Sequence, residues 1–264
     1  EVLLKHFIQR ANEGSSMIRP RLAIGIPSGV TAVERRAVMD AALQAGASEV
    51  FLIDEPIAAA IGAGLPVSEP TGSMIIDIGG GTTEVAILSL NGSVISESVR
   101  IAGDELNDAI VNYMKKVHNL VIGERTAEDI KIQVGSAYPT PDDKDVTMEV
   151  RGLHLLAVLL RTVTIKGPEV RESMSEPLSV IVEAVKRTLE RTPPELASDI
   201  IDRGIMLAGG GALLRGIDTL IGQETGIVTH IANDPLTSVV LGAGKVLENF
   251  KQSERVFSGR SRNL

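Results

Sequence analysis

Residues 74–88 read MIIDIGGGTTEVAIL, in which two apolar segments are joined by three glycines. This pattern predicts a β-hairpin, with one strand over residues 74–78 and a second that begins at residue 83. Consecutive glycines permit positive φ and carry no Cβ, so their backbone N–H groups can approach an anion closely. Two threonine hydroxyls add further donors. The predicted phosphate-binding residues are Gly79, Gly80, Gly81, Thr82 and Thr83.

Asp77 lies near the end of the first predicted strand, beside the glycines. A carboxylate and a phosphate repel each other, so we expect Asp77 to hold a magnesium-bound water rather than the phosphate itself. The alternative is a tight hairpin whose glycines serve only the turn. The aspartate, the threonine pair and both strands agree with one another, and this agreement favours phosphate binding.

Composition limits the possible classes of function. The 264 residues are 44% hydrophobic and 23% charged, an ordinary balance for one large or two moderate globular domains. The net charge of -8 argues against nucleic acid as the main partner. The absence of Cys excludes disulfides, thiolate metal sites and Cys nucleophiles. Because no apolar run approaches the ~20 residues that span a bilayer and no secretory signal is visible, we expect a cytoplasmic location.

Upstream of the hairpin, the sequence predicts a βαβ unit. Short apolar strands are expected over residues 21–26 and 50–53, with a helix from about 32 to 45 between them. Thr31 and Glu34 have the spacing of a capping box at the start of this helix. Strand, helix and strand in this order predict a partly parallel sheet.

The rest of the chain is predicted to mix strands and helices. Another strand is expected over residues 93–101, after Asn91-Gly92, which is a strong hairpin signal. Further strands are expected over residues 146–150, 161–165, 205–208 and 227–231. Helices are expected over residues 56–61, 105–117, 127–134, 177–191 and 235–250, and from the glycines near 210 to about 224. The tail carries Lys251, Arg255, Arg260 and Arg262, and we expect it to be disordered.

A second glycine-rich segment, AGGGA at residues 208–212, lies between a predicted strand and a predicted helix. Open α/β sheets bind ligands at strand ends, and a glycine surface there can lie flat against a base or a ribose. The alternative is an ordinary strand-to-helix turn.

Asp54 and Glu55 follow the strand expected at residues 50–53. A carboxylate at this position can orient a water molecule for attack on a phosphate. Negative charge also suits a helix N-terminus, and the residues by themselves favour this capping role.

These motifs resemble a known superfamily. The D-x-G-G-G-T hairpin is similar to the second phosphate loop of actins, heat-shock chaperones and sugar kinases. The wider segments FLIDEPIAAAIGAGLPV (51–67) and GSMIIDIGGGTTEVAILSLNG (72–92) closely resemble the MreB-type bacterial actins. Further similar segments are VERRAV (33–38), RIAGDELNDAI (100–110), PPELASDI (193–200) and GGGALLRGID (209–218). The resemblance covers nearly the whole chain, apart from residues 154–160 and the tail.

The resemblance implies an α/β, actin-like (ribonuclease H-like) fold with two halves around a nucleotide cleft. Residues 1–72 would belong to the first half, and residues 73–234 would form the second, with a smaller subdomain inserted at about 104–166. A helix over residues 235–250 would return to the first half, and residues 251–264 would form a tail.

The resemblance also implies ATP and Mg²⁺ as cofactors, with Glu55 orienting the attacking water and Asp54 capping the helix. In this family, a Gly-Asp pair contacts ribose and phosphate, and a nearby basic residue lies close to the nucleotide. The family often has Glu where this chain has Gln133, which can still donate and accept hydrogen bonds; without the family, Lys131 is simply a solvated helix residue. The remaining implied nucleotide-binding positions are Gly103, Asp104, Lys131, Gln133, Gly209, Gly210, Gly211 and Ala212.

The function implied by the resemblance is that of an ATP-binding cytoskeletal protein that maintains rod shape. Copies would stack head to tail into filaments on the inner membrane surface, and these filaments would organise cell-wall synthesis together with cell-wall elongation proteins. The alternatives are a small-molecule kinase, which would need a substrate pocket and a longer chain, and a chaperone-type ATPase, which would need a peptide-binding domain after the last helix.

Two features depart from the family pattern. The first phosphate loop, a D-x-G-T-like hairpin, is not found, because Asp77-Ile78-Gly79 is already assigned to the other loop and Asp202-Arg203-Gly204 is followed by Ile and not by Thr. We therefore expect the family's N-terminal part to be missing, so that the ATPase activity of the intact family is uncertain here and ATP binds weakly. The second feature is GLHLLAVLL at residues 152–160, where seven of nine residues are apolar. A lipid-facing insertion would explain it, but burial in the core or in a subunit contact is the favoured interpretation.

Overall fold

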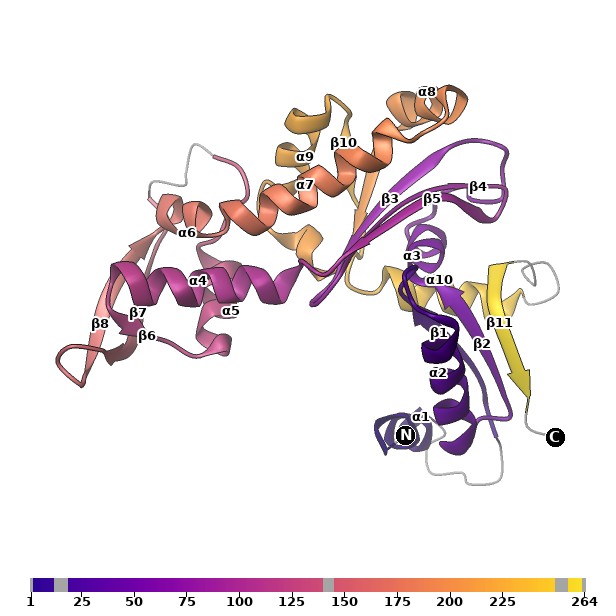
Figure 1. The fold of residues 1–264 in the computed structure, drawn as a ribbon, viewed down its shortest axis with the longest axis horizontal. Coiled ribbons are helices and arrows are strands. Elements are labelled where there is room, and N and C mark those ends of the chain that lie inside the picture. The colour runs from indigo at the N-terminus through magenta and orange to yellow at the C-terminus, as the bar shows by residue number, and fades with distance from the viewer. Residues whose placement is uncertain (1, 12–18, 140–144, 250–255, 263–264) are drawn as a thin grey trace.

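The structure is a computed structural model that describes residues 2–11, 19–139, 145–249 and 256–262. The molecule is elongated, with three β-sheets along its length and helices between and beside them (Figure 1). Its first helix and last strand lie at the same end (Figure 1). The buried side chains are mostly Ile, Val, Leu and Ala, and they form clusters on the first and second sheets, one of which extends to the third sheet through Leu120, Val150 and Ile165.

The first sheet contains three strands. Their order is β1 (Arg21–Ile26), β2 (Glu49–Asp54) and β11 (Phe257–Arg262). β1 and β2 are parallel and are connected through α2 (Ala32–Gln44), which confirms the predicted βαβ unit. The capping box is also confirmed, because Thr31 N donates to Glu34 Oε2 at 2.9 Å and Glu34 N donates to Thr31 Oγ1 at 3.3 Å. α1 (Val2–Ala11) contacts α2.

β11 shows that the expectation of a wholly disordered tail is wrong. The strand pairs antiparallel with β2, and the ring of Phe257 lies 4.8 Å from that of Phe51. Its sequence, FSGRSR, has little strand propensity, so the pairing is explained by the unpaired backbone groups that the edge of β2 offers. Residues 250–255 and 263–264 of the predicted last helix and tail lie outside the described residues.

The second sheet is mixed and lies at the centre of the molecule. Its strand order is β10 (Thr229–Ile231), β9 (Ile205–Ala208), β3 (Ser73–Ile78), β4 (Thr83–Ser89) and β5 (Gly92–Val99). β3 and β4 form the predicted hairpin, and β9 is parallel to β3. The β4–β5 hairpin is also confirmed, but its two-residue turn is Leu90-Asn91, one position earlier than expected. Their φ values of 51° and 63° are those of a type I′ turn.

Two helices lie between the first and second sheets. They are α3 (Glu55–Gly62) and α10 (Ser238–Glu248). Their backbones touch, because a Cβ on Gly62 would lie 1.8 Å from Ser238 O, and one on Gly242 would lie 1.8 Å from Ala58 O. Glycine is therefore required at both positions, and the pair is packed without intervening side chains.

The part of the molecule farthest from the first sheet is built around the third sheet (Figure 1). Its elements are α4 (Gly103–Val117), β6 (Leu120–Val121), α5 (Glu124–Gln133), β7 (Thr147–His154), β8 (Leu159–Lys166) and α6 (Gly167–Ser173). The strand order is β6-β7-β8, and β7 and β8 form an antiparallel hairpin. The chain then returns to the second sheet through α7 (Ser175–Glu190) and α8 (Pro194–Arg203). Residues 140–144 lie outside the described residues.

The helix predicted over residues 177–191 ends at Glu190, before Pro193-Pro194, and Pro194 is the first residue of α8, a helix that was not predicted, where a missing N–H costs nothing. Two further predictions differ from the structure. The helix expected after β9 is broken into η1 (Gly210–Leu213) and α9 (Ile217–Thr225), because Gly216 adopts a φ of 73° between them. β7 and β8 are longer than predicted and include most of residues 152–160, whose large apolar side chains are exposed, so burial in the core of this chain is wrong.

Candidate functional site

The loop between β3 and β4 is the first part of the site. Gly79 N donates to Thr82 O at 2.9 Å and closes the turn. Thr83 is buried, and its hydroxyl donates to Ile101 O at 2.7 Å. Thr83 therefore supports the loop from within the sheet, and Thr82 is the remaining hydroxyl donor for a ligand.

The start of α4 lies against this loop. Gly103 N donates to Gly79 O at 3.1 Å, and Asp104 N donates to Gly80 O at 2.8 Å. A Cβ on Gly80 would lie 3.7 Å from the carboxylate oxygens of Asp104, so the side chain of Asp104 borders the glycine loop. The hairpin and the helix start thus form one continuous backbone surface.

Lys131 on α5 closes one side of this surface. Its Nζ donates to Gly103 O at 2.8 Å. Partial burial lowers the pKa of Lys131, while the negative charges of Glu128 and Asp104 act in the opposite direction. A partly desolvated cation with an unsaturated hydrogen-bonding capacity is suited to an anionic ligand. By contrast, Gln133 is exposed and does not line the same cavity.

The second glycine loop meets the end of β3. Gly209 has a φ of 81°, and a Cβ there would lie 2.3 Å from Ile78 O and 2.5 Å from Asp77 Oδ1. A Cβ on Gly211 would lie 2.2 Å from Ile78 Cγ2. Glycine is therefore required because the loop passes directly over β3, which brings the two glycine segments together across parallel strands.

The two glycine loops, α4 and α5 surround one cavity of ≈ 440 Å³, a volume within the range of small-molecule sites. The predicted residues that line it are Gly79, Gly80, Gly103, Asp104, Lys131, Gly210 and Gly211. Lining residues that were not predicted include Glu128, Ile132, Leu213, Leu214, Arg215 and Leu236. Of the predicted residues outside this lining, Gly81 and Thr82 continue the first glycine loop, and Ala212 is buried behind the second. A larger cavity of ≈ 590 Å³ between α6, α7 and α9 contains none of the predicted residues.

Asp77 and Glu55 are acidic groups with perturbed acidity. Burial, followed by the charge of Glu84, raises the pKa of Asp77 to about 6. Burial, followed by the charges of Asp77 and Glu84, raises the pKa of Glu55 to about 7. Glu55 begins α3 and Asp77 lies in β3, so the effect of Asp77 on the pKa of Glu55 shows that the start of α3 lies near the glycine hairpin. Carboxyl groups tuned to near-neutral pH are typical of acid–base sites.

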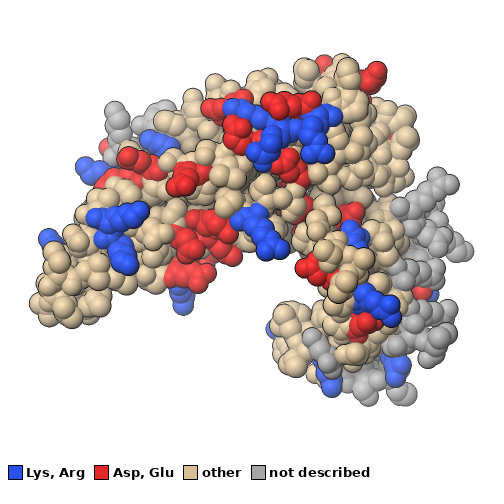
Figure 2. Space-filling model, viewed as in Figure 1, with Lys and Arg blue, Asp and Glu red and all other residues tan. Residues whose placement is uncertain are grey.

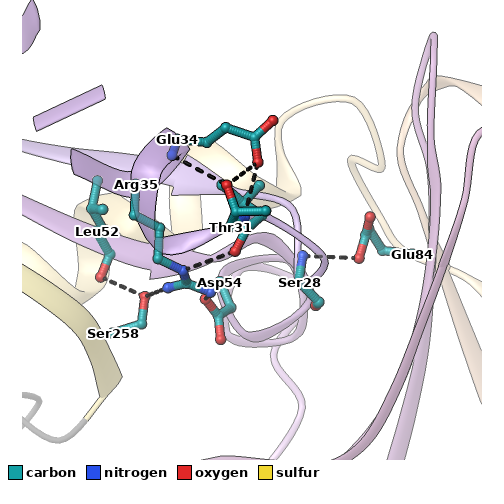
Figure 3. A network of polar contacts seen from close by, with 9 residues as sticks. Ser28, Thr31, Glu34, Arg35, Leu52, Asp54, Glu84 and Ser258 are labelled. Atoms are coloured by element: carbon teal, nitrogen blue, oxygen red, sulfur yellow. Dashed lines mark hydrogen bonds and ion pairs between the residues drawn. The ribbon is translucent and has the colours of Figure 1, made fainter. Parts of the chain in front are cut away.

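Glu84 is the acidic residue that sequence reasoning missed. It is fully buried in β4 and accepts hydrogen bonds from Ser98 Oγ at 2.5 Å and from Ser28 N at 3.2 Å. Figure 3 shows that the Ser28–Glu84 contact connects the segment after β1 to the second sheet. The sequence signal for Glu84 was a single charged residue inside a predicted strand that is mostly apolar. Its hydrogen-bond partners could not be predicted, because they lie 14 and 56 residues away in the sequence.

Asp54 precedes Glu55 at the N-cap position of α3, but its carboxylate makes no capping hydrogen bond. It instead lies 3.3 Å from Arg35 Nη2. Arg35 also donates to Ser258 Oγ at 2.8 Å, so α2, β2 and β11 are joined in one network (Figure 3). The side chain of Asp54 therefore supports the first sheet rather than the helix start.

The described residues include no group of three or more His, Asp or Glu side chains arranged to hold a metal ion by themselves. No helix in the described ranges is long and apolar enough to cross a membrane.

Comparison with known proteins identifies the family. The family model for "MreB/Mbl protein" matches residues 1–255. The cell shape-determining protein MreB of Escherichia coli K12 is 55% identical over 249 residues, which cover 94% of this chain and 71% of that protein. The cell shape-determining protein Mbl of Bacillus subtilis 168 is 45% identical over 249 residues, covering 94% of this chain and 74% of that protein.

Solved structures support the same assignment. MreB5 of Spiroplasma citri, in a crystal structure bound to ADP, matches with a TM-score of 0.90 and 36% identity, covering 97% of this chain and 76% of that chain. The MamK double helical filament matches with a TM-score of 0.76 and 21% identity, covering 93% of this chain and 74% of that chain, which shows likeness of fold alone. The predicted actin-like α/β fold is confirmed, and the chain belongs to the MreB/Mbl family of actin-like cytoskeletal proteins.

Proposed function

We propose that this chain binds ATP with Mg²⁺ in the cavity between its two glycine loops, and that nucleotide binding drives head-to-tail assembly into filaments. These filaments lie on the inner face of the cell membrane and organise cell-wall synthesis with elongation proteins. The convergence of the two glycine loops, α4 and α5 on one cavity carries the proposal. The Spiroplasma citri relative was crystallised with ADP and with AMPPNP, which supports a nucleotide as the ligand.

The cleft is proposed to lie between two halves of the molecule. Residues 1–72 and α10 form one half, and residues 73–234 form the other, with the third sheet and its helices inserted at about 104–166. The packing of α10 on α3 supports this division, because it returns the end of the chain to the first half.

Each part of the cavity has a proposed role. The backbone N–H groups of residues 80–82 bind the phosphates, with Asp104 and Lys131 beside them. The glycine surface at residues 209–211 packs against the adenine. Glu128 is better placed than Gln133 to accept hydrogen bonds from the ribose, since it lines the cavity and Gln133 does not.

Asp77 and Glu55 are the proposed acidic groups of hydrolysis. Mg²⁺ keeps several waters and shares its ligands with substrate phosphates, so a site with few protein carboxylates fits it. Asp77 would hold such a water, and the bound cation would neutralise charge on the phosphate oxygens. Positive charge lowers the pKa of nearby carboxyl groups, so Glu55 would be ionised and able to orient the attacking water once the ligand is in place.

A matched pair of glycine variants tests the nucleotide site. Gly80→Val places a side chain at the glycine loop, and the nearest atoms to its Cβ are 3.7 Å away, so the protein should fold. Gly244→Ala is the control, because nothing lies within 4 Å of its Cβ. In titration with a fluorescent ATP analogue, we expect binding that Gly80→Val weakens at least about tenfold, or ~1.4 kcal/mol.

Pelleting of the same proteins with and without Mg-ATP tests assembly. We expect ATP to increase the pelleted fraction of the unmodified chain and of Gly244→Ala, and to have little effect on Gly80→Val. Equal nucleotide affinity in the two variants would contradict the site. A pelleted fraction that does not change with ATP, although ATP binding is measurable, would contradict nucleotide-driven assembly. Because the chain contains one phosphate loop where the resemblance implies two, we expect weak affinity and would extend the titration to high nucleotide concentration.

A further inference from the structure

The tip of the β7–β8 hairpin exposes a concentrated group of large apolar side chains. It stands at the end of the molecule farthest from the first sheet (Figure 1), where Figure 2 shows a surface with few charged side chains. The exposed residues are Leu153 (42%), Leu155 (42%), Leu156 (79%), Val158 (72%), Leu159 (68%) and Leu160 (75%), and we call them the apolar tip. Large apolar groups gathered in this way mark an interaction surface.

Both faces of the hairpin tip carry exposed apolar side chains. The single polar side chain in residues 152–160 is that of the half-buried His154, whose Nε2 lies 3.3 Å from Arg161 Nη1. Leu159 and Leu160 are consecutive residues of β8, so their side chains point to opposite faces of the hairpin, yet both are exposed. Leu160 is paired with Leu153, so the apolar character continues across both strands. A folded protein partner covers one face of a hairpin, whereas an apolar phase surrounds both. The distribution therefore fits insertion into lipid better than docking on a protein surface.

The charged residues at the base of the apolar tip also favour a lipid environment. The segment from Val150 to Ile165 contains no Asp or Glu, although the whole chain has a net charge of -8. It contains Arg151 and Arg161, and the register places Arg161 opposite Gly152, next to Arg151. Two cations at the boundary of an apolar group match the anionic headgroups of a bilayer, which attract basic residues beside an inserted segment.

The length of the apolar tip also agrees with insertion into the surface region of a bilayer. The tip contains two cross-strand pairs, Leu153 with Leu160 and His154 with Leu159, followed by the turn at residues 155–158. At about 3.3 Å per residue, the paired part and its turn reach roughly 7–10 Å beyond the arginines. This equals the depth of about 5–10 Å at which interfacial segments bury apolar side chains.

We propose that the apolar tip inserts into the headgroup region of an anionic bilayer, with Arg151 and Arg161 at the lipid phosphates. This inference rests on the proposed membrane location and names the element that makes the contact. It also gives the contact a place in the fold, at the outer end of the third sheet and away from the nucleotide cavity.

Flotation with lipid vesicles tests the proposal. The 264-residue chain is mixed with vesicles of equal parts phosphatidylglycerol and phosphatidylcholine, or of phosphatidylcholine alone, and the floating fraction is measured. We expect binding to the anionic vesicles, and about tenfold weaker binding for the double variant Leu156→Asp/Leu159→Asp. Replacing Arg151 or Arg161 with Gln should weaken binding to anionic vesicles roughly fivefold for each arginine and leave binding to phosphatidylcholine unchanged.

The control places aspartates at equally exposed apolar positions elsewhere. Ile201 and Val228 are each 64% exposed, and Ile201→Asp/Val228→Asp should float like the unmodified chain. If the unmodified chain floats and the tip variant floats equally well, the tip is not the contact, and the membrane location stands without it. If the unmodified chain does not float, both are wrong. If the tip variant instead lowers the mass measured by sedimentation without lipid, the tip is a contact between copies, and the proposal is overturned.

Discussion

The β3–β4 hairpin and the β7–β8 hairpin are the same local motif in opposite surroundings. Both are antiparallel pairs, but β3 and β4 are buried almost throughout, whereas most of β7 and β8 is exposed. The first hairpin turns through glycines and presents backbone N–H groups, while the second turns through leucines and presents apolar side chains. The layers packed around a hairpin therefore decide whether its tip is a rigid binding loop or a projecting surface.

The largest difference between the two hairpins should appear on truncation of one side chain in each. Ile76 in β3 is 0% exposed and Leu159 in β8 is 68% exposed. Ile76→Ala should lower the free energy of unfolding by about 3 kcal/mol, because it leaves a cavity in the central sheet. Leu159→Ala should change it by less than about 0.5 kcal/mol. Urea unfolding measures both, and a similar loss in the two variants would contradict the contrast in packing.

A smaller effect is expected where the second glycine loop crosses the buried hairpin. Gly209→Ala puts a Cβ 2.3 Å from Ile78 O at a residue with a φ of 81°. We expect a loss of about 2 kcal/mol in unfolding free energy from strain and backbone displacement, together with weaker nucleotide binding. Gly244→Ala in α10 meets nothing within 4 Å and should be neutral or stabilising by up to about 1 kcal/mol. Thermal unfolding of the two alanine variants side by side separates crowding from a general effect of replacing glycine.

The smallest effect concerns Glu55, a partly buried carboxyl group beside the β3–β4 hairpin. A carboxyl group whose pKa is raised by folding destabilises the native state as pH rises from its unfolded value toward its folded value. For Glu55 this window runs from 4.5 to about 7. Glu55→Gln should therefore unfold like the unmodified chain near pH 4 and be more stable at pH 8. Since the group is partly exposed and solvent screens its charge, the expected gain is about 1 kcal/mol, well below the full value of the shift.

Glu34 provides a control of opposite sign for this experiment. Its hydrogen bonds to Thr31 lower its pKa, so its contribution to stability is present above the ordinary pKa and is lost as pH falls. Glu34→Gln should be less stable than the unmodified chain at pH 8, and the two should converge in acid. A gain at pH 8 for both variants would show that the effect of Glu55 reflects general charge reduction and not its buried position.

Local chemistry was sufficient to predict much of the fold and of the site. The capping box of α2, the βαβ unit and the two hairpins at residues 73–99 follow from residues that are close in sequence. Both glycine loops were also predicted from their sequence, and the approach of Gly209 to Ile78 shows why the second loop needs glycine.

The features that were not predicted depend on distant partners. Glu84 acquires its role from Ser28 and Ser98, and β11 becomes a strand because β2 presents an open edge to it. The apolar tip was expected to be buried because its composition matches a core, but no other element of the described chain covers it. The composition of a segment shows which environments suit its side chains, and the packing of other elements decides whether the segment is buried or exposed.

The contact between α3 and α10 has a mechanical consequence. With glycines at the crossing and backbone atoms in direct contact, the two helices cannot slide along each other without first separating. They therefore form a single packed unit between the first and second sheets, and their apolar side chains pack against both. Any displacement of one sheet relative to the other must therefore carry the two helices together or open the contact between their backbones.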